Sequence, residues 1–403
     1  MRNLLVSLAF LMSMGASAAV IDLNTVTERA KKKNYTVLQN AEMLYQSKMT
    51  MVKSRTDLLP SLNLWDILNS VTGFEVNLIE DLCPFLIPSN WFRKAENELL
   101  YQADKLGYRA LVANEVMNAR AIYWRILHDQ DLVQILDEHI KELDSILEAI
   151  RIREEIGVVP VGTTRELKIR QLGLKDDWNQ LRLLYQRELL SLTMALGYPA
   201  EQHHIIRKDE LKMIDRVGRV GFENELKYVL ALSPELQQFD YFVRVIPNLR
   251  GEVYFAIMGA GKASRGLPGG VFDSLPTLNG LGFSQAPVLK IIASQERLLK
   301  LQRDGVRETL KRQWQGFINE FTIGLERRAN LADRIRLTNQ AKDYIEEKIK
   351  RGESLNLFEL LDISRSLMET QIAYVALQYH LRAQLDIRDR LQFQGGYRGI
   401  ERL

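Results

Sequence analysis

The fold is decided by a stretch of 64 residues, from Phe92 to Glu155, with the sequence FRKAENELLYQADKLGYRALVANEVMNARAIYWRILHDQDLVQILDEHIKELDSILEAIRIREE. It contains no proline, and its single glycine is Gly107. Because most of the other residues are good helix formers, the stretch is predicted to be one helix about 95 Å long. A helix of this length does not fit within a compact globular domain, so the sequence predicts an elongated architecture.

A second stretch of the same kind runs from Val288 to Arg351, again over 64 residues and without proline. Its weak points as a helix are three glycines, Gly305, Gly316 and Gly324. Each long helix is followed by a short glycine-bearing segment and then by a second helix, expected over residues 164–196 and 355–393. The unit of long helix, tip and shorter helix therefore occurs twice.

Short sequence matches also indicate a duplication. Leu38-Gln39 matches Leu236-Gln237 at an offset of 198 residues, and the same offset relates Ala95, Glu98, Leu100 and Gly107 to Ala293, Glu296, Leu298 and Gly305. Pro60 resembles Pro247 at an offset of only 187. Either the helix before Pro247 is about three turns shorter than its counterpart, or Pro247 is not the equivalent residue.

Strand-like stretches lie between the paired helices. A hairpin is expected over about residues 60–82, and a second β region over about 248–286, including Val253 to Ile257. In the hairpin, apolar residues alternate with polar ones, as expected where one face of a strand meets lipid and the other meets water. The residues expected to face lipid are Leu62, Leu64, Phe74, Val76 and Leu78. These strands are no longer than the roughly 9 to 11 residues that cross a bilayer, so a soluble hairpin stays an alternative.

The N-terminus has the pattern of a signal peptide over residues 1–18. Arg2 is followed by an apolar run from Leu4 to Met14 and by Ala16-Ser17-Ala18, a small-x-small cleavage site. Apart from this run, no stretch of about 20 apolar residues occurs, so no transmembrane helix is expected. The mature chain is predicted to be exported, and any membrane crossing would then require a β-barrel.

Catalysis and cofactor binding find no support in the sequence. The net charge of +3 gives no reason to expect a nucleic-acid partner, and one cysteine, Cys83, excludes an intrachain disulfide and a cysteine-based metal site. His203-His204 lies near Asp209-Glu210 in a segment without helical ligand spacing, so a polar linker is the favoured interpretation. Gly259–Ser264 lacks the spacing of a phosphate-binding loop. We therefore expect no catalytic, cofactor or metal site, and no enzyme.

Four local sequences, in this order along the chain, resemble the TolC family of outer-membrane factors. They are Leu58-Leu59-Pro60, Glu154-Glu155-Ile156-Gly157-Val158-Val159, Tyr185…Leu192…Leu196-Gly197, and Arg351-Gly352-Glu353-Ser354-Leu355…Glu359-Leu360-Leu361-Asp362. Together with the signal peptide and the repeated helices, the resemblance covers nearly all the mature chain. The short strands, the Pro247 mismatch and the glycine-rich segment Gly259–Gly282 depart from the family pattern.

The resemblance implies a mainly α fold with a small β part. Duplicated long helices would form a tunnel, and short β-hairpins would contribute to a trimeric 12-stranded outer-membrane β-barrel. The implied function is a passive exit duct of a tripartite efflux or type I secretion system, located in the outer membrane with a periplasmic helical tunnel. Its partners would be two further copies of the chain, a periplasmic adaptor, an inner-membrane transporter and outer-membrane lipid. The alternative is a periplasmic α-helical scaffold of the same family that has lost its barrel.

The expected organisation begins with the signal peptide, residues 1–18, and a first repeat, residues 19–196. An equatorial linker, residues 197–230, a second repeat, residues 231–393, and a C-terminal tail, residues 394–403, follow. The two tips are expected at residues 156–163 and 352–354.

By resemblance, the tips would dock the adaptor through Gly157, Val158, Val159, Gly352, Glu353 and Ser354. The alternative is that the glycines simply end helices. Glu359 and Asp362 lie three residues apart on one helix face and match the acidic residues that ring the tunnel constriction in the family. Arg365 and Arg165 are candidate partners during closure. The alternative is that both acids only stabilise the positive N-terminal end of their helix.

Overall fold

The computed structural model describes residues 19–59, 84–199, 204–208, 223–255, 285–351 and 357–403. The predicted signal peptide, the lipid-facing set Leu62, Leu64, Phe74, Val76 and Leu78, and the second tip with Gly352, Glu353 and Ser354 lie outside these residues. The described helices are α2 (Leu23–Lys33), α3 (Tyr35–Thr56), α6 (Pro88–Glu155), α7 (Thr163–Ala195), α8 (Glu223–Leu232), α9 (Pro234–Phe255), α10 (Gln285–Lys350) and α11 (Leu357–Gln392).

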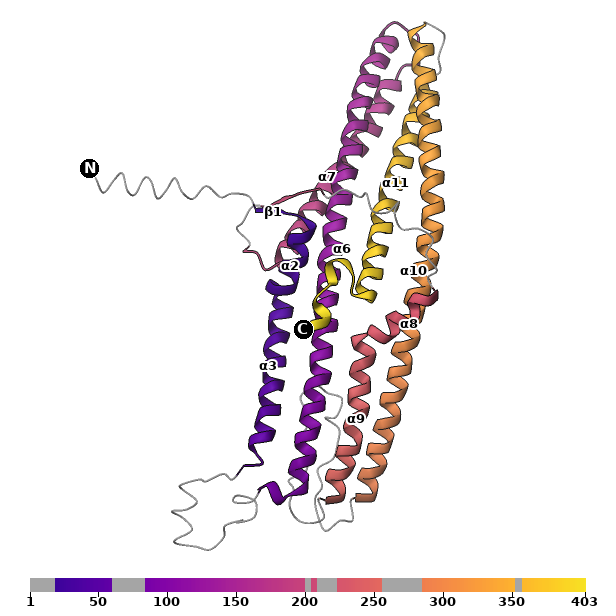
Figure 1. Cartoon of the computed structure of the whole chain (residues 1–403). Helices are drawn as coiled ribbons and strands as arrows, with labels where there is room; N and C mark the ends of the chain where they lie inside the picture. The colour runs from indigo at the N-terminus through magenta and orange to yellow at the C-terminus, as the bar shows by residue number, and fades with distance from the viewer. Residues whose placement is uncertain (1–18, 60–83, 200–203, 209–222, 256–284, 352–356) are drawn as a thin grey trace, which may run out of the picture.

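The long helices α6 and α10 run almost the whole length of the elongated molecule (Figure 1). Over one half of this length, α3 packs on α6, α6 on α9, and α9 on α10. Over the other half, α7 packs on α6, α6 on α11, and α11 on α10. Each half is therefore a row of four helices, in which α3 or α7 forms one edge and α10 forms the other edge.

The two halves of the chain repeat the same helix order. The series α2, α3, α6, α7 corresponds to α8, α9, α10, α11, and α3 and α9 both contain 22 residues. Pro60 follows the end of α3, whereas Pro247 lies inside α9. Pro247 is therefore not the equivalent of Pro60, and the idea that the second helix is shorter is wrong.

The prediction of a β region from residue 248 is also wrong for residues 248–255, because these residues continue helix α9. Val245, Leu249 and Val253 are buried at four-residue spacing and pack in one apolar cluster with Val288, Ile292 and Leu299 of α10. Burial of this helical stripe outweighs the β-propensity of the stretch from Val253 to Phe255. The expected strands after residue 255 lie outside the described residues.

A region at mid-length, which we call the girdle, joins the two repeats. It comprises two short strands and the turns that follow α11, together with the parts of the helices against which they pack. Strands β1 (Ala19–Ile21) and β2 (His204–Ile206) pair in parallel, with Ile21 opposite Ile206. After α11 the chain folds back through η4 (Gly395–Tyr397) and η5 (Ile400–Arg402). Tyr397 and Ile400 from these turns are buried in the same core as Tyr123 and Trp124 of α6. The expected linker, residues 197–230, thus contains β2 and most of α8.

Among the described residues, none of the helices combines the length and the apolar character needed to cross a bilayer.

Candidate functional site

The first tip is the turn between α6 and α7. Gly157 has a φ of +77° and Gly162 has a φ of +101°, the left-handed region that glycine adopts without strain. The amide of Val158 donates to the carbonyl of Arg153 at 2.9 Å, which closes the end of α6. The interpretation of Gly157 as a helix terminator is therefore correct, and it leaves the docking prediction open.

Glu154 fixes the far side of this turn. Its Oε1 accepts from the amide of Gly162 at 2.6 Å, and its Oε2 accepts from the amide of Thr164 at 2.9 Å and from the Thr164 hydroxyl. These hydrogen bonds lower the pKa of Glu154 below its ordinary value. A carboxylate of α6 thus caps the positive N-terminal end of α7, which holds the turn in one conformation.

The side chains at this tip are apolar and face solvent. Ile156, Val158 and Val161 are exposed by 68%, 67% and 94%, and Val159 is half-buried. Water-facing apolar residues on a rigid turn are typical of a surface that another protein covers.

The two predicted gate residues lie in the first turns of α11, and both are exposed. Asp362 lines a hollow of about 350 Å³, whose other lining residues include His139 on α6 and Arg170 and Asp177 on α7. Arg365, expected as a partner during closure, instead pairs with Glu369 at 2.9 Å. One of the two acids therefore lies beside helices of the first repeat.

A junction that the sequence did not reveal lies next to this hollow. Glu142 on α6 pairs with Lys342 of α10 at 2.7 Å. His139, one turn earlier, has its Nδ1 3.2 Å from the hydroxyl of Ser364 on α11, two residues after Asp362. Burial opposes ionisation of Glu142, but its contact with Lys342 and the nearby His139, 3.8 Å away, prevail and lower its pKa to about 2. Glu142 and His139 thus join α6 of the first repeat to α10 and α11 of the second.

The buried His139 therefore has a side-chain partner on another helix. His128 and His380 have partners as well, because His128 lies 2.9 Å from Asp129 and His380 lies 3.3 Å from Glu320. Within the described ranges, no cluster of three or more His, Cys, Asp or Glu residues has a geometry that could hold a metal ion.

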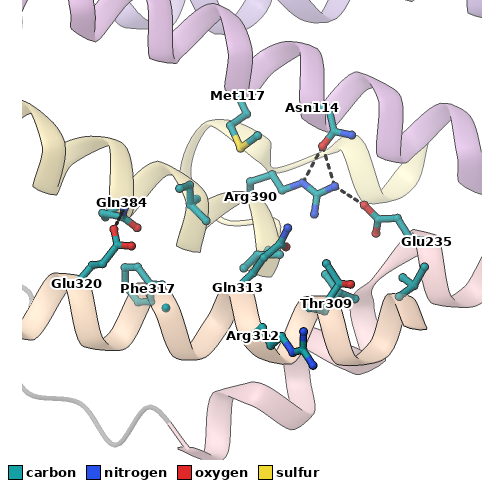
Figure 2. A pocket seen from close by; sticks show the side chains of 15 residues that line it. Asn114, Met117, Glu235, Thr309, Arg312, Gln313, Phe317, Glu320, Gln384 and Arg390 are labelled. Atoms are coloured by element: carbon teal, nitrogen blue, oxygen red, sulfur yellow. Dashed lines mark hydrogen bonds and ion pairs between the residues drawn. The ribbon is translucent and has the colours of Figure 1, made fainter. Parts of the chain in front are cut away.

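A second hollow, of about 690 Å³, lies where α6, α9, α10 and α11 meet (Figure 2). Arg390 of α11 reaches across it, donating to Asn114 Oδ1 at 2.8 Å and pairing with Glu235 of α9. Arg390 holds the pKa of the half-buried Glu235 carboxyl below its ordinary value, although burial opposes this effect. Gln384 donates to Glu320 at 2.5 Å on the other side of the hollow. Polar bonds thus tie α11 to its three neighbours at the girdle.

Three solved structures that share this arrangement of helices are described as outer-membrane proteins or channels. The outer-membrane channel CmeC of Campylobacter jejuni matches with a TM-score of 0.70 and 11% identity, over 94% of this chain and 88% of that chain. The outer-membrane protein VceC of Vibrio cholerae matches with a TM-score of 0.68 and 10% identity, over 92% and 96% of the two chains. The open state of the Neisseria gonorrhoeae channel MtrE matches with a TM-score of 0.66 and 13% identity, over 93% and 89%.

The chain has the fold of the TolC-family outer-membrane factors. No family model matches the sequence, and no curated protein matches it either. The likeness covers nearly the whole of both chains, so the shared fold includes the duplicated long helices and the girdle. The predicted fold class, a mainly α architecture of duplicated long helices, is thereby confirmed.

Proposed function

We propose that this protein is an outer-membrane channel that acts as a passive exit duct for efflux or secretion, with its helices forming a tunnel in the periplasm. The observation that carries the proposal is the TolC-type fold, shared over almost the whole chain with proteins described as outer-membrane channels. A single protomer presents an open row of helices, so a duct needs further copies of the chain.

The two edges of the row support a closed assembly. On the α3 edge, Tyr35, Leu38, Tyr45, Met49 and Val52 are exposed and follow one another at the three-, four- and seven-residue steps of a coiled-coil seam. The other end of that edge, on α7, exposes Ile169, Leu172, Leu183, Leu190 and Met194. On the α10 edge, Ile291 and Leu298 lie seven residues apart, and Ile323, Leu337 and Tyr344 lie at multiples of seven.

Apolar stripes on two different edges favour head-to-tail contact between identical chains. Such an interface generates a ring when the rotation between copies closes. We propose three copies, as the resemblance implies, in which the α3 and α7 edge of one protomer meets the α10 edge of the next. The closed ring would then have a wall of twelve helices at each level.

The membrane segments are proposed from the connections at one end of the molecule. The end of α3, the start of α6, the end of α9 and the start of α10 all lie there (Figure 1). We propose that the segments joining these helices, residues 60–83 and 256–284, supply the barrel strands. Leu62, Leu64, Phe74, Val76 and Leu78 would face lipid.

The opposite end is proposed to receive a periplasmic adaptor, which would in turn connect the channel to an inner-membrane transporter. The exposed side chains of Val158 and Val161 on the rigid first tip support docking at Gly157, Val158 and Val159. Gly352, Glu353 and Ser354 are the proposed second contact. Glu359 and Asp362 lie just beyond that tip and are proposed to ring the tunnel mouth with acidic groups.

Fractionation followed by conductance measurement tests the proposed function. The full-length protein should be extracted from the outer-membrane fraction only by detergent, and the purified protein should form channels in planar bilayers. Val76→Lys should reduce outer-membrane yield, because a charge facing lipid costs about 2–4 kcal/mol near the bilayer midplane. Asn77→Lys, on the water-facing side, is the matched control. Recovery of the wild type in the soluble periplasmic fraction without channel activity would instead identify a helical scaffold.

A further inference from the structure

A buried and a half-buried carboxyl group lie close together between α6 and α7 near the girdle. Asp129 on α6 is 4% exposed, and the side chain of Glu188 on α7 is 13% exposed. The two side chains are close enough for Asp129 to act directly on the ionisation of Glu188. The antiparallel register agrees, because Gln130 of α6 donates to the Tyr185 hydroxyl of α7 at 3.1 Å.

The pair is short of hydrogen-bond donors. Asp129 Oδ2 and Glu188 Oε2 are shielded from solvent, and within the described part of the chain neither accepts a hydrogen bond from a donor group. His128 Nδ1 lies 2.9 Å from the other oxygen of Asp129. Arg125 is 3.9 Å from Glu188, beyond hydrogen-bond distance, and its side chain is 66% exposed. Two ionised carboxylates in this arrangement would repel each other at a site that water reaches poorly.

We propose that Asp129 and Glu188 share one proton, and that this proton joins α7 to α6 in a contact that loosens when the proton is lost. One proton converts the repelling pair into an O–H···O⁻ hydrogen bond and thereby supplies the donor that the pair lacks. A metal ion is the less suitable occupant, because no described cluster supplies the three ligands that would hold it.

The pKa of Glu188 supports this assignment. Burial raises it to about 7, the negative charge of Asp129 raises it as well, and Arg125 opposes the shift. The other titratable or charged groups around the pair are His128 and Asp131 on α6, Tyr185 on α7, Tyr379 on α11 and Lys208 after β2. Tyr379 and Lys208 both bind Asp131, at 2.9 and 2.5 Å. Asp131 therefore has partners of its own, outside the Asp129–Glu188 pair.

The pH window follows from the direction of the shift. When the part of α7 around Glu188 is released, Glu188 ionises at its ordinary value of 4.5, whereas in the packed state it keeps its proton up to about pH 7. Between these values, this local release becomes roughly tenfold more favourable for each pH unit, and above pH 7 the effect levels off. The contact is therefore tightest in acid and weakest above neutral pH, whether or not the chain is a channel.

Hydrogen exchange of the full-length protein in detergent tests the proposal, with rates corrected for intrinsic exchange. In the wild type, protection of the amides near Glu188 should fall up to about 100-fold between pH 5 and pH 7. Amides of α7 near Glu166 should not show this fall. Glu188→Gln replaces the shared proton with a permanent N–H donor, so its protection should no longer depend on pH over this interval.

Glu166→Gln is the matched control, because Glu166 is an exposed residue of the same helix that pairs with Arg170 at the surface. This variant should keep the wild-type response. Asp129→Asn tests the pair from the other helix and provides a second variant if Glu188→Gln does not fold. A wild type without the local pH response, or a folded variant of the pair that keeps it, would overturn the proposal.

Discussion

The guanidinium of Arg120 on α6 and the carboxylate of Asp386 on α11 form a two-point ion pair in the core of the girdle. Their bonds measure 2.6 Å from Nη2 to Oδ1 and 3.1 Å from Nε to Oδ2, and both side chains are at most 5% exposed. Trp124 donates to the same carboxylate at 2.7 Å, and Thr27 of α2 accepts from Arg120 at 3.0 Å. One carboxylate of the second repeat thus organises three elements of the chain.

Asp386→Ala should destabilise the protein by about 3–5 kcal/mol, because it leaves the Arg120 charge buried without a partner. The measurement is chemical unfolding of the detergent-solubilised protein. Glu148→Ala removes a partner of Arg151 in an exposed pair and should change the stability by no more than about 1 kcal/mol. Equal effects of the two changes would contradict the structural role of Asp386.

The Glu142 junction should make the protein sensitive to acid. Its folded pKa of about 2 lies below the ordinary 4.5, so its contribution is present above pH 4.5 and is lost as the pH falls towards 2. Glu142→Gln should therefore flatten the decline in unfolding midpoint between about pH 5 and pH 2. Glu138→Gln, one turn earlier on the same helix, should leave the decline unchanged. If Glu142→Gln declines as steeply as the wild type, the junction does not stabilise the protein.

Glu96 should have the opposite pH dependence. It is 6% exposed on α6, and burial together with the nearby Glu252 raises its pKa to about 8. Because the unfolded chain ionises near 4.5, stability should fall as the pH rises from about 4.5 to 8 and then level off. Glu96→Gln should remove this part of the fall and be more stable than the wild type at pH 8. Glu98→Gln is the control, and a Glu96→Gln profile parallel to the wild type would contradict the prediction.

The proposed acidic ring predicts block of the channel by cations. Three copies of Glu359 and Asp362 would place six carboxylates around one axis, where divalent or trivalent cations bind favourably. The double change Glu359→Ala with Asp362→Ala should weaken this block in planar bilayers. Unaltered block in a folded assembly would assign both residues to stabilising the start of α11 instead.

The elongated, duplicated helical fold was predictable for two reasons. Both long stretches lack proline, and each is followed by a glycine-bearing tip and a shorter helix. The end of α9 was wrongly predicted as a strand because Val253, Tyr254 and Phe255 all have a high β-propensity. The prediction overlooked the helical stripe of buried residues that joins Val253 to Val245 and Leu249. The polar pairs between distant parts of the sequence could not be predicted, for a different reason. Helical periodicity shows which face of a helix is buried, but it does not show that residue 120 faces residue 386, or that residue 129 faces residue 188.

The central claim, that three protomers close edge to edge into a tunnel, is tested most directly by disulfide trapping. Tyr45 on the α3 edge and Leu301 on the α10 edge are both exposed. They lie at a similar level along the row of helices. Ser47 of α3 contacts Asp104 of α6, and Gly107 of α6 lies against Gln238 of α9. Asp240 of α9 in turn pairs with Arg303 of α10. The double variant Tyr45→Cys with Leu301→Cys, made with Cys83→Ser, should yield covalently linked dimers and trimers upon oxidation in detergent. The control pair, Tyr45→Cys with Tyr344→Cys at the far end of α10, should remain monomeric on a denaturing gel. Absence of linked species for the first pair, or equal linking by both pairs, would contradict the closed ring.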